Sequence, residues 1–140
     1  MSQENVEIVR QALECFERRD WDSAAPLYDP HVEQHGTVGG IEEGHVLRGP
    51  DEIRRSFESE DEIWAEHRME LEKFIDVGDR VVVLLREYQR GKASRIETVV
   101  ETAAIIDLRE GRIVRMQGYM DRGAALEAAG ASEQDARANS

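Results

Sequence analysis

The chain is poor in cysteine and in long apolar stretches, and each shortage excludes a class of protein. Cys15 is the single cysteine among 140 residues, so no internal disulfide can form. A chain of this length buries enough surface to fold as one domain without such a cross-link. No apolar run approaches the roughly twenty residues that a membrane-spanning helix needs. We therefore expect one folded domain and no membrane partner.

Basic charge is also scarce. Lys and Arg number 18 against 30 Asp and Glu, which gives a formal net charge of −12. The cations are interleaved with acids, as at Arg54 and Arg55, whereas a protein that binds duplex DNA needs clustered cations to displace counterions. We therefore exclude nucleic acid as a partner and interpret the acidity as a means of staying soluble. The polar start, Ser2 to Asn5, does not resemble a secretion signal, so we expect a cytoplasmic protein.

Three segments of the N-terminal half have helical patterns. Val6, Val9, Leu13 and Phe16 recur at helical spacing and predict a helix over residues 3–18. Proline fits only the first turn of a helix, so Pro26 limits a second, short helix to a start near Asp22 or Ser23 and an end before Asp29. Gly49-Pro50-Asp51-Glu52 is typical of a helix start and predicts a third helix.

Between the second and third helices, alternation over residues 31–35 predicts a short strand. Residues 36–49 hold five glycines and predict a long loop, a feature that is often functional in a compact domain.

From residue 68 onward the pattern is that of strands. A first strand near residues 69–75 leads to a tight turn, and the β-branched and aromatic run Val81 to Tyr88 predicts a second strand. Ile96 to Leu108 and residues 113–120 predict two more, and a helix from Arg122 to Gly130 follows. The fold class is therefore α+β, with a curved antiparallel sheet wrapped around the N-terminal helices. The domain covers residues 1–130, and residues 131–140 are expected to be a disordered tail.

This order of elements resembles the SnoaL-like (polyketide-cyclase-like) branch of the nuclear-transport-factor-2-like (NTF2-like) superfamily. The most recognisable stretches are Asn5 to Asp22, Leu27 to Glu33, Gly49 to Ile53, Gly78 to Val83 and Gly111 to Gly130. The resemblance implies a cone-shaped fold around a pocket for a small apolar molecule, and it implies neither a cofactor nor a metal. It does not specify a reaction, because this fold hosts isomerases, epoxide hydrolases, cyclases, dehydratases and non-catalytic binders.

Three positions where ketosteroid isomerases of this fold keep reactive groups hold unreactive side chains here. The oxyanion-hole Tyr aligns with Ala12, the general-base Asp with Gln34, and the second oxyanion-hole acid with Ala104. Methyl groups and an amide can neither abstract a proton nor donate strongly to an enolate. Ketosteroid isomerisation is therefore disfavoured. The absence of a cavity His at Ala104 also separates the chain from typical cyclases of the family.

Asp121 is the candidate catalytic residue, because SnoaL-type cyclases keep an acid/base group at this position after the last strand. The alternative is that Asp121 caps the helix that starts at Arg122, and one carboxylate at a cavity rim could do both. Epoxide hydrolases of the fold need an Asp-Arg-Asp relay. Arg86 and Asp121 could belong to one, but no second inward Asp is evident.

The candidate substrate-binding residues are Gln34, Trp64, Arg86, Tyr88, Met116 and Met120. Gln34 would orient a polar group, and Met116 and Met120 would flank the space left by Gly118. Arg86 and Tyr88 share one face of their strand, but a one-residue slip inverts the faces, so their direction stays open. For the apolar residues, plain core packing is the alternative.

Two further clusters bear on metals and partners. His31, Glu33 and His35 would share one strand face like a metal site, but the family points Val32 and Gln34 inward, and we expect no metal. On the last strand, the face formed by Ile113, Arg115, Gln117 and Tyr119 suits a protein interface, and many relatives dimerise there. We therefore expect a homodimer.

Two functions remain open. The first is an acid/base enzyme, like a cyclase, isomerase or hydrolase, acting on a small apolar substrate. The second is a non-catalytic binding or assembly module of the same fold, favoured by the unreactive side chains at Ala12, Gln34 and Ala104.

Overall fold

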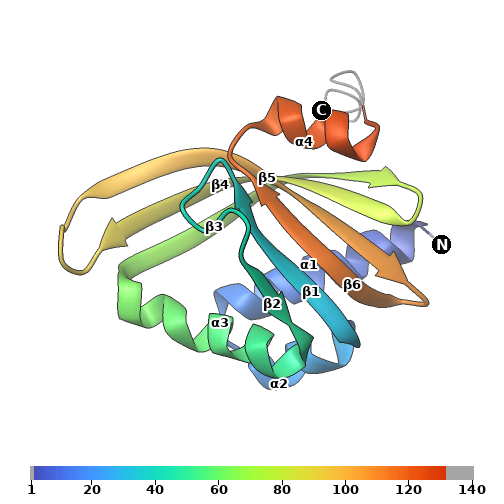
Figure 1. The fold of residues 1–140 in the computed structure, drawn as a ribbon, viewed down its shortest axis with the longest axis horizontal. Coiled ribbons are helices and arrows are strands. Elements are labelled where there is room, and N and C mark those ends of the chain that lie inside the picture. Colours follow the sequence, from blue (N-terminus) through green and yellow to red (C-terminus); the bar gives the residue numbers. More distant parts are fainter. Residues whose placement is uncertain (1, 132–140) are drawn as a thin grey trace.

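The computed structural model describes residues 2–131, which form one curved sheet with helices on both of its faces (Figure 1). The predicted tail lies, apart from Ala131, outside the described residues. No described helix is long and apolar enough to cross a membrane. In chain order the elements are α1 (Ser2–Glu17), α2 (Trp21–Ala24), the 3-10 helix η1 (Ala25–Leu27), β1 (Tyr28–Val38), β2 (Val46–Arg48), α3 (Gly49–Ile63), β3 (Trp64–Val77), β4 (Arg80–Gly91), β5 (Glu97–Arg109), β6 (Arg112–Tyr119) and α4 (Arg122–Ala129).

The sheet has six strands in the order β2-β1-β6-β5-β4-β3. Strands β3 to β6 form an antiparallel meander, as predicted, and β1 pairs antiparallel with β2. The pairing of β1 with β6 is parallel, and the sequence pattern made no prediction of how the first strand pairs. This pairing joins the first strand of the chain to the last and places β1 between β2 and β6.

Two apolar cores lie on the two faces of the sheet. The inner core packs Val9 of α1 and Phe57 of α3 against Val83 of β4 and its neighbours. The outer core packs Leu126 of α4 against Leu84 of β4 and other outward side chains. In Figure 1, α1 and α3 lie on one side of the sheet and α4 on the other. The run Val81 to Leu85 is consequently buried on both faces of β4.

The region between α2 and α3 differs from the prediction. Strand β1 extends over Tyr28–Val38 instead of residues 31–35, and β2 lies within the predicted loop of residues 36–49. The loop is thereby reduced to residues 39–45. Its base is closed by a hydrogen bond from Gly36 N to His45 O of 2.8 Å, and a Cβ on Gly36 would lie 1.7 Å from Glu42 O. Gly36 is therefore needed for the close return of the chain and does not break the strand.

The helix starts agree with their sequence signals. Helix α3 begins at Gly49, and α2 begins at Trp21, one residue before the predicted start, where Asp20 accepts a hydrogen bond from Ser23 N at 3.2 Å. Helix α4 (Arg122–Ala129) covers the predicted segment and is capped by Gly130, whose φ of 75° is the left-handed conformation that glycine adopts without strain.

A register shift in β6 corrects the predicted faces of the last strand. The pairing with β5 is irregular between Asp107 and Leu108, as expected of a β-bulge. Ile113, predicted to share a face with Arg115, is instead fully buried in the inner core. Beyond the bulge the prediction holds, because Met116 packs against the inner core. The extra residue of the bulge reverses the alternation at this point of the strand.

Candidate functional site

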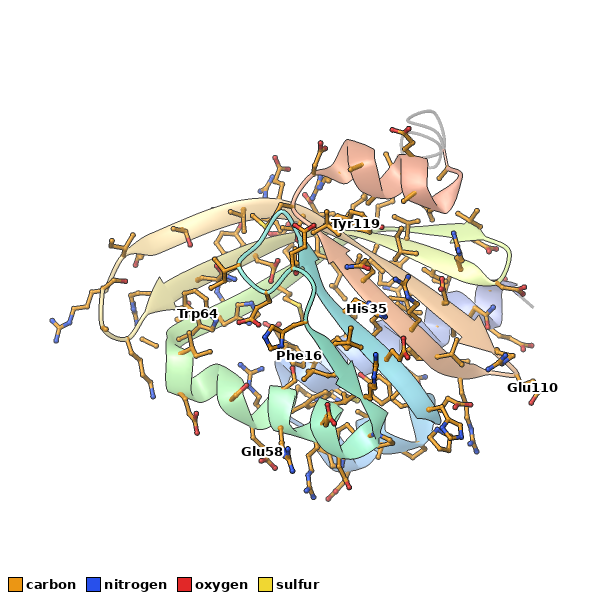
Figure 2. The ribbon with its side chains drawn as sticks, viewed as in Figure 1. Phe16, His35, Glu58, Trp64, Glu110 and Tyr119 are labelled. Atoms are coloured by element: carbon orange, nitrogen blue, oxygen red, sulfur yellow. The ribbon has the colours of Figure 1, made fainter. Side chains whose placement is uncertain are left out.

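A cavity of about 260 Å³ lies on the inner face of the sheet, between α3 and the strands. Its apolar wall includes Leu13 and Phe16 of α1, Phe57 of α3, Trp64 and Met69 of β3, Leu85 of β4, Ile106 of β5 and Met116 of β6. Its polar groups include Gln34, His35 and Thr37 of β1, His67 of β3, Glu87 and Gln89 of β4, and Thr102 of β5. Figure 2 labels four lining residues, Phe16, His35, Trp64 and Tyr119, which come from four different elements. Such an apolar pocket with a few convergent polar groups is typical of small-molecule sites.

Three polar side chains in the cavity lining, Thr102, Glu87 and His67, are linked to one another by hydrogen-bond contacts. Thr102 Oγ1 donates to Glu87 Oε2 at 2.9 Å, and His67 Nε2 lies 3.2 Å from Glu87 Oε1. The side chains of His67 and Glu87 are 5% and 22% exposed. The sheet brings the three residues together, because adjacent strands pair Met69 with Glu87 and Leu85 with Thr102. The strand alternation then points all three side chains to the inner face.

The His67 imidazole is held in place by aromatic rings as well as by Glu87. Its ring centroid lies 6.5 Å from the Phe16 ring, which meets it edge-on, and 6.5 Å from the Trp64 ring, which is nearly parallel to it. A carboxylate beside an imidazole is a common arrangement for moving a proton at a reacting group, because the carboxylate orients the ring and stabilises its charged form. This arrangement can perform acid–base chemistry on a molecule in the cavity.

The remaining polar groups complete the lining from β1 and β6. Gln117 Nε2 donates to Gly36 O at 2.7 Å, while Gln117 Oε1 accepts from Arg115 at 3.1 Å. Both ends of that amide are therefore committed to the protein. Burial raises the pKa of Tyr28 well above its ordinary value, so its phenol stays neutral in the lining.

Three of the predicted site residues line the cavity, and four lie elsewhere. Gln34, Trp64 and Met116 belong to the lining. Met120 is 42% exposed and lies outside the lining, next to Gly39.

Arg86 and Tyr88 point to the outer face of the sheet, which settles the direction that the sequence left open. Arg86 lies 3.4 Å from Glu101 and 3.7 Å from Glu72, and the Tyr88 hydroxyl donates to Glu70 at 3.2 Å. Neither residue lines the cavity.

Asp121 adopts the capping geometry. Its Oδ1 accepts from Gly123 N at 2.9 Å at the start of α4, and it does not line the cavity. The next residue, Arg122, reaches back to the sheet. It donates to Leu85 O at 2.8 Å and Thr102 O at 3.1 Å and pairs with Glu72 and Glu101. The end of β6 is thereby tied to the outer side of the strands that carry Glu87 and Thr102.

The sequence prediction missed His67, Glu87 and Thr102. The signal that could have found Glu87 is its spacing from Leu85, since both residues share one strand face. This spacing could not be used, because residues Val81 to Leu85, which precede Glu87, are apolar on both faces of the strand and give no indication of which face is inward.

Two members of the cluster on β1, Glu33 and His35, are in hydrogen-bond contact with each other. His35 Nε2 lies 2.9 Å from Glu33 Oε1, and Arg48 lies 3.6 Å from the same carboxylate. The hydrogen bond with His35, helped by the charge of Arg48, lowers the pKa of Glu33 below its ordinary value. Within residues 2–131 no group of three or more His, Cys, Asp or Glu side chains is arranged to hold a metal ion.

Comparisons with known proteins agree with this architecture. An NTF2-like protein of unknown function from Burkholderia pseudomallei K96243 is 23% identical, with a TM-score of 0.74 over 89% of this chain and 95% of that one. TerC, crystallised with polyporic acid, is 22% identical, with a TM-score of 0.73 over 91% and 99% of the two chains. A hypothetical protein with a ketosteroid isomerase-like fold from Catenulispora acidiphila DSM 44928, in complex with trimethylamine, is 17% identical, with a TM-score of 0.72 over 91% and 95%.

No curated protein matches the chain significantly. The family model of the SnoaL-like domain matches residues 9–116, which is most of the chain. This match spans the helices and strands that build the cavity. The chain therefore belongs to the SnoaL-like family and has the NTF2-like fold.

Proposed function

We propose that this protein binds a small, largely apolar molecule in the cavity and acts on it by acid–base chemistry. The observation that carries the proposal is the partly buried, hydrogen-bonded group of Thr102, Glu87 and His67 in the cavity lining. Glu87 and His67 would exchange a proton with the substrate, and Thr102 would stabilise the carboxylate by its hydrogen bond. The reaction class is proton transfer, as in an isomerisation, a cyclisation or a hydrolysis.

The other lining residues would position the substrate. The amides of Gln34 and Gln89 can donate to or accept from a polar group, and Trp64 and Met116 supply the apolar surface. A ketosteroid isomerase mechanism remains disfavoured, because Gln34 and Ala104 line the cavity at the positions where that mechanism needs acids. The acid–base group is thus assigned to different strands from those used by ketosteroid isomerases.

The related structures support a small organic ligand. TerC was crystallised with polyporic acid, and the Catenulispora protein with trimethylamine. At 22% and 17% identity these likenesses concern the fold, and they do not carry either ligand over to this chain.

A non-catalytic binding module is the second candidate. It is favoured by Ala104, a methyl group where many relatives keep a reactive side chain. In such a module the Thr102–Glu87–His67 chain would serve only to satisfy polar groups within the cavity wall. Both candidates predict a ligand, and they differ in turnover.

The test begins with a thermal-shift screen of polyketide-like aromatics, terpenoid epoxides, steroids and lactones. A ligand present at about 100 times its dissociation constant adds about 2.7 kcal/mol of stability. Compounds that bind are then assayed for turnover with the wild type, Glu87→Gln and Asp121→Asn. We expect Glu87→Gln to lower kcat by about 10²- to 10⁴-fold, the usual contribution of a general acid or base.

Asp121→Asn is the matched control, because Asn caps a helix about as well as Asp. It should leave kcat unchanged. A large loss in Asp121→Asn alone would return the catalytic role to Asp121. Tight binding without turnover would favour the non-catalytic module.

Self-association is a separate proposal. The outer face of β6 carries Arg115, whereas Gln117 is buried, and in Figure 1 α4 lies over a different part of the sheet. We propose that this face joins two copies in a homodimer, with Ile113 excluded because it faces the inner core. Light scattering coupled to size-exclusion chromatography should give twice the monomer mass for the wild type and a monomer for Arg115→Glu. A monomeric wild type would contradict the proposal.

A further inference from the structure

We propose that the cavity selects a positively charged ligand, an alkylated or aromatic ammonium compound, and that Glu87 is its counter-ion. This inference rests on the proposed role of the cavity as a ligand site. It concerns the charge of the ligand, on which the acid–base proposal makes no statement.

The first observation is the sign of the charges in the lining. Of the described residues that line the cavity, Glu87 is the carboxylate, and none is a lysine or an arginine. His35 and His67 are the other titratable nitrogens, and each contacts a carboxylate, Glu33 and Glu87 respectively. An anionic ligand would lose its hydration next to the Glu87 carboxylate, with no arginine or lysine among the described lining residues to pair with it. Burying a charge without a partner of opposite charge costs free energy.

The second observation explains why cations are missing from the cavity. On β3 and β4 the arginines occupy positions that alternate with the lining residues and so point to the outer face. Arg68 lies 3.1 Å from Glu66, Arg86 lies 3.4 Å from Glu101, and Arg90 lies 3.6 Å from Glu66.

Arg122, from α4, joins the same outer network through Glu72 and Glu101. Arg19 contacts Phe16, which is one of the lining residues. Its guanidinium lies 5.2 Å from the Phe16 ring centroid and donates to Phe16 O, and it is not part of the lining. The arginines of these strands therefore pair with carboxylates on the far side of the sheet from Glu87.

The third observation is that Glu87 can still accept a ligand. Oε2 of Glu87 accepts from Thr102 and Oε1 contacts His67, and a carboxylate oxygen can accept more than one hydrogen bond. With 22% of its side chain exposed, Glu87 is open to the cavity. The same cavity is lined by the aromatic rings of Phe16, Phe57 and Trp64, and such rings attract alkylated ammonium groups by the cation–π interaction.

The size of the cavity limits the ligand. About 260 Å³ is just below the range of roughly 300–1,000 Å³ that is usual for pockets of drug-sized ligands. A single aromatic ring with a compact head group is of suitable size. The net charge of −12 favours the approach of such a cation further, since long-range attraction raises its local concentration.

The test compares three probes of nearly equal shape: phenyltrimethylammonium, tert-butylbenzene and benzenesulfonate. Dissociation constants are measured by NMR titration or calorimetry for the wild type, Glu87→Gln and Glu70→Gln. Glu70 is the matched control, because it lies on the outer face of the neighbouring strand, where it accepts a hydrogen bond from Tyr88. We expect the wild type to bind the ammonium at least tenfold more tightly than the hydrocarbon and to bind the sulfonate most weakly.

In Glu87→Gln the affinity for the ammonium should fall at least tenfold, while the affinity for tert-butylbenzene stays within about twofold. Glu70→Gln should match the wild type for all probes. The comparison of probes on the wild type does not depend on any variant folding. Equal binding of the ammonium and the hydrocarbon by the wild type, or an unchanged ratio in Glu87→Gln, would overturn the inference, as would the failure of all three probes to bind.

These outcomes can be told apart from failure of the proposed function. Hydrocarbon binding without a preference for the ammonium would leave an open ligand cavity and remove only the charge selection. Ammonium selection by a protein whose turnover is unaffected in Glu87→Gln would leave the present inference standing and overturn the catalytic role.

Discussion

Replacing Gly118 by alanine should destabilise the protein, because β1 and β6 approach each other closely at this residue. A Cβ built on Gly118 would lie 2.7 Å from Thr37 Oγ1, 3.4 Å from Thr37 Cβ and 3.5 Å from Thr37 Cγ2. Thr37 is β-branched, so its χ1 angle is stiff and a rotation would bring another of its atoms into the same space. The strands would have to separate, or Thr37 would have to leave its rotamer.

Two opposing effects decide the magnitude. Overpacking in a folded interior costs about 1–3 kcal/mol. Alanine also restricts the unfolded chain and contributes about 0.4–1 kcal/mol in the opposite direction when the native conformation is allowed. The clash is the larger effect, so Gly118→Ala should lower the free energy of unfolding by about 1.3 kcal/mol, the difference between the midpoints of these two ranges.

Urea denaturation of a double-mutant cycle is the assay. Thr37→Ala removes both Oγ1 and Cγ2, so Gly118→Ala should cost much less in that background, and the coupling between the two substitutions should exceed about 0.5 kcal/mol, the lower limit for residues in contact. The midpoint should move with little change in m if the transition stays two-state. A Gly118→Ala protein as stable as the wild type, or substitutions that are simply additive, would refute the close approach of β1 and β6.

Three further predictions concern the helix cap, the arginine that follows it and one ion pair. Asp121→Ala should lower the free energy of unfolding by about 0.5–2 kcal/mol through loss of the cap, whereas Asp121→Asn should be nearly neutral; equal losses in thermal denaturation would contradict the cap. Arg122→Met should cost about 1–3 kcal/mol, because it leaves the Thr102 carbonyl without its side-chain donor, and an unchanged midpoint of denaturation would argue against this contact. The pKa of Glu33 is lowered in the folded protein, so its contribution to stability is present above the unfolded pKa and is lost as the pH falls through the folded pKa. His35→Ala should therefore move the carboxyl titration of Glu33, followed by NMR, towards higher pH, and an unmoved titration would show that His35 does not cause the shift.

Elements with local signals could be predicted from the sequence. Helix α3 follows from a proline and two acids at its start, and α4 from Asp121 and Gly130 at its two ends. Strand β2 and the far half of β1 could not be predicted, because their stability comes from pairing with each other and with β6, which is distant in the sequence. The side-chain direction of Ile113 depended on a bulge, which alternation alone does not reveal.

The cavity residues divide in the same way. Gln34, Trp64 and Met116 could be proposed from the family resemblance and from apolar character. Glu87 and His67 could not be proposed, because selecting them requires knowing which of the two alternating sets of side chains on β3 and β4 faces the inner core. The apolar run Val81 to Leu85 packs against helices on both faces of the sheet, so it lacks the alternation of apolar and polar residues that would have identified the inner face.

The parallel pairing of β1 with β6 has a consequence for how the protein folds. Strands β3 to β6 are joined by short turns and can pair as successive hairpins, whereas β1 must wait for a partner that lies near the end of the chain. During synthesis, which proceeds from the N-terminus, β1 stays without its parallel partner until β6 has left the ribosome. We expect closure of the sheet at β1 to be the slow step of folding, with the ligand cavity absent until that step is complete.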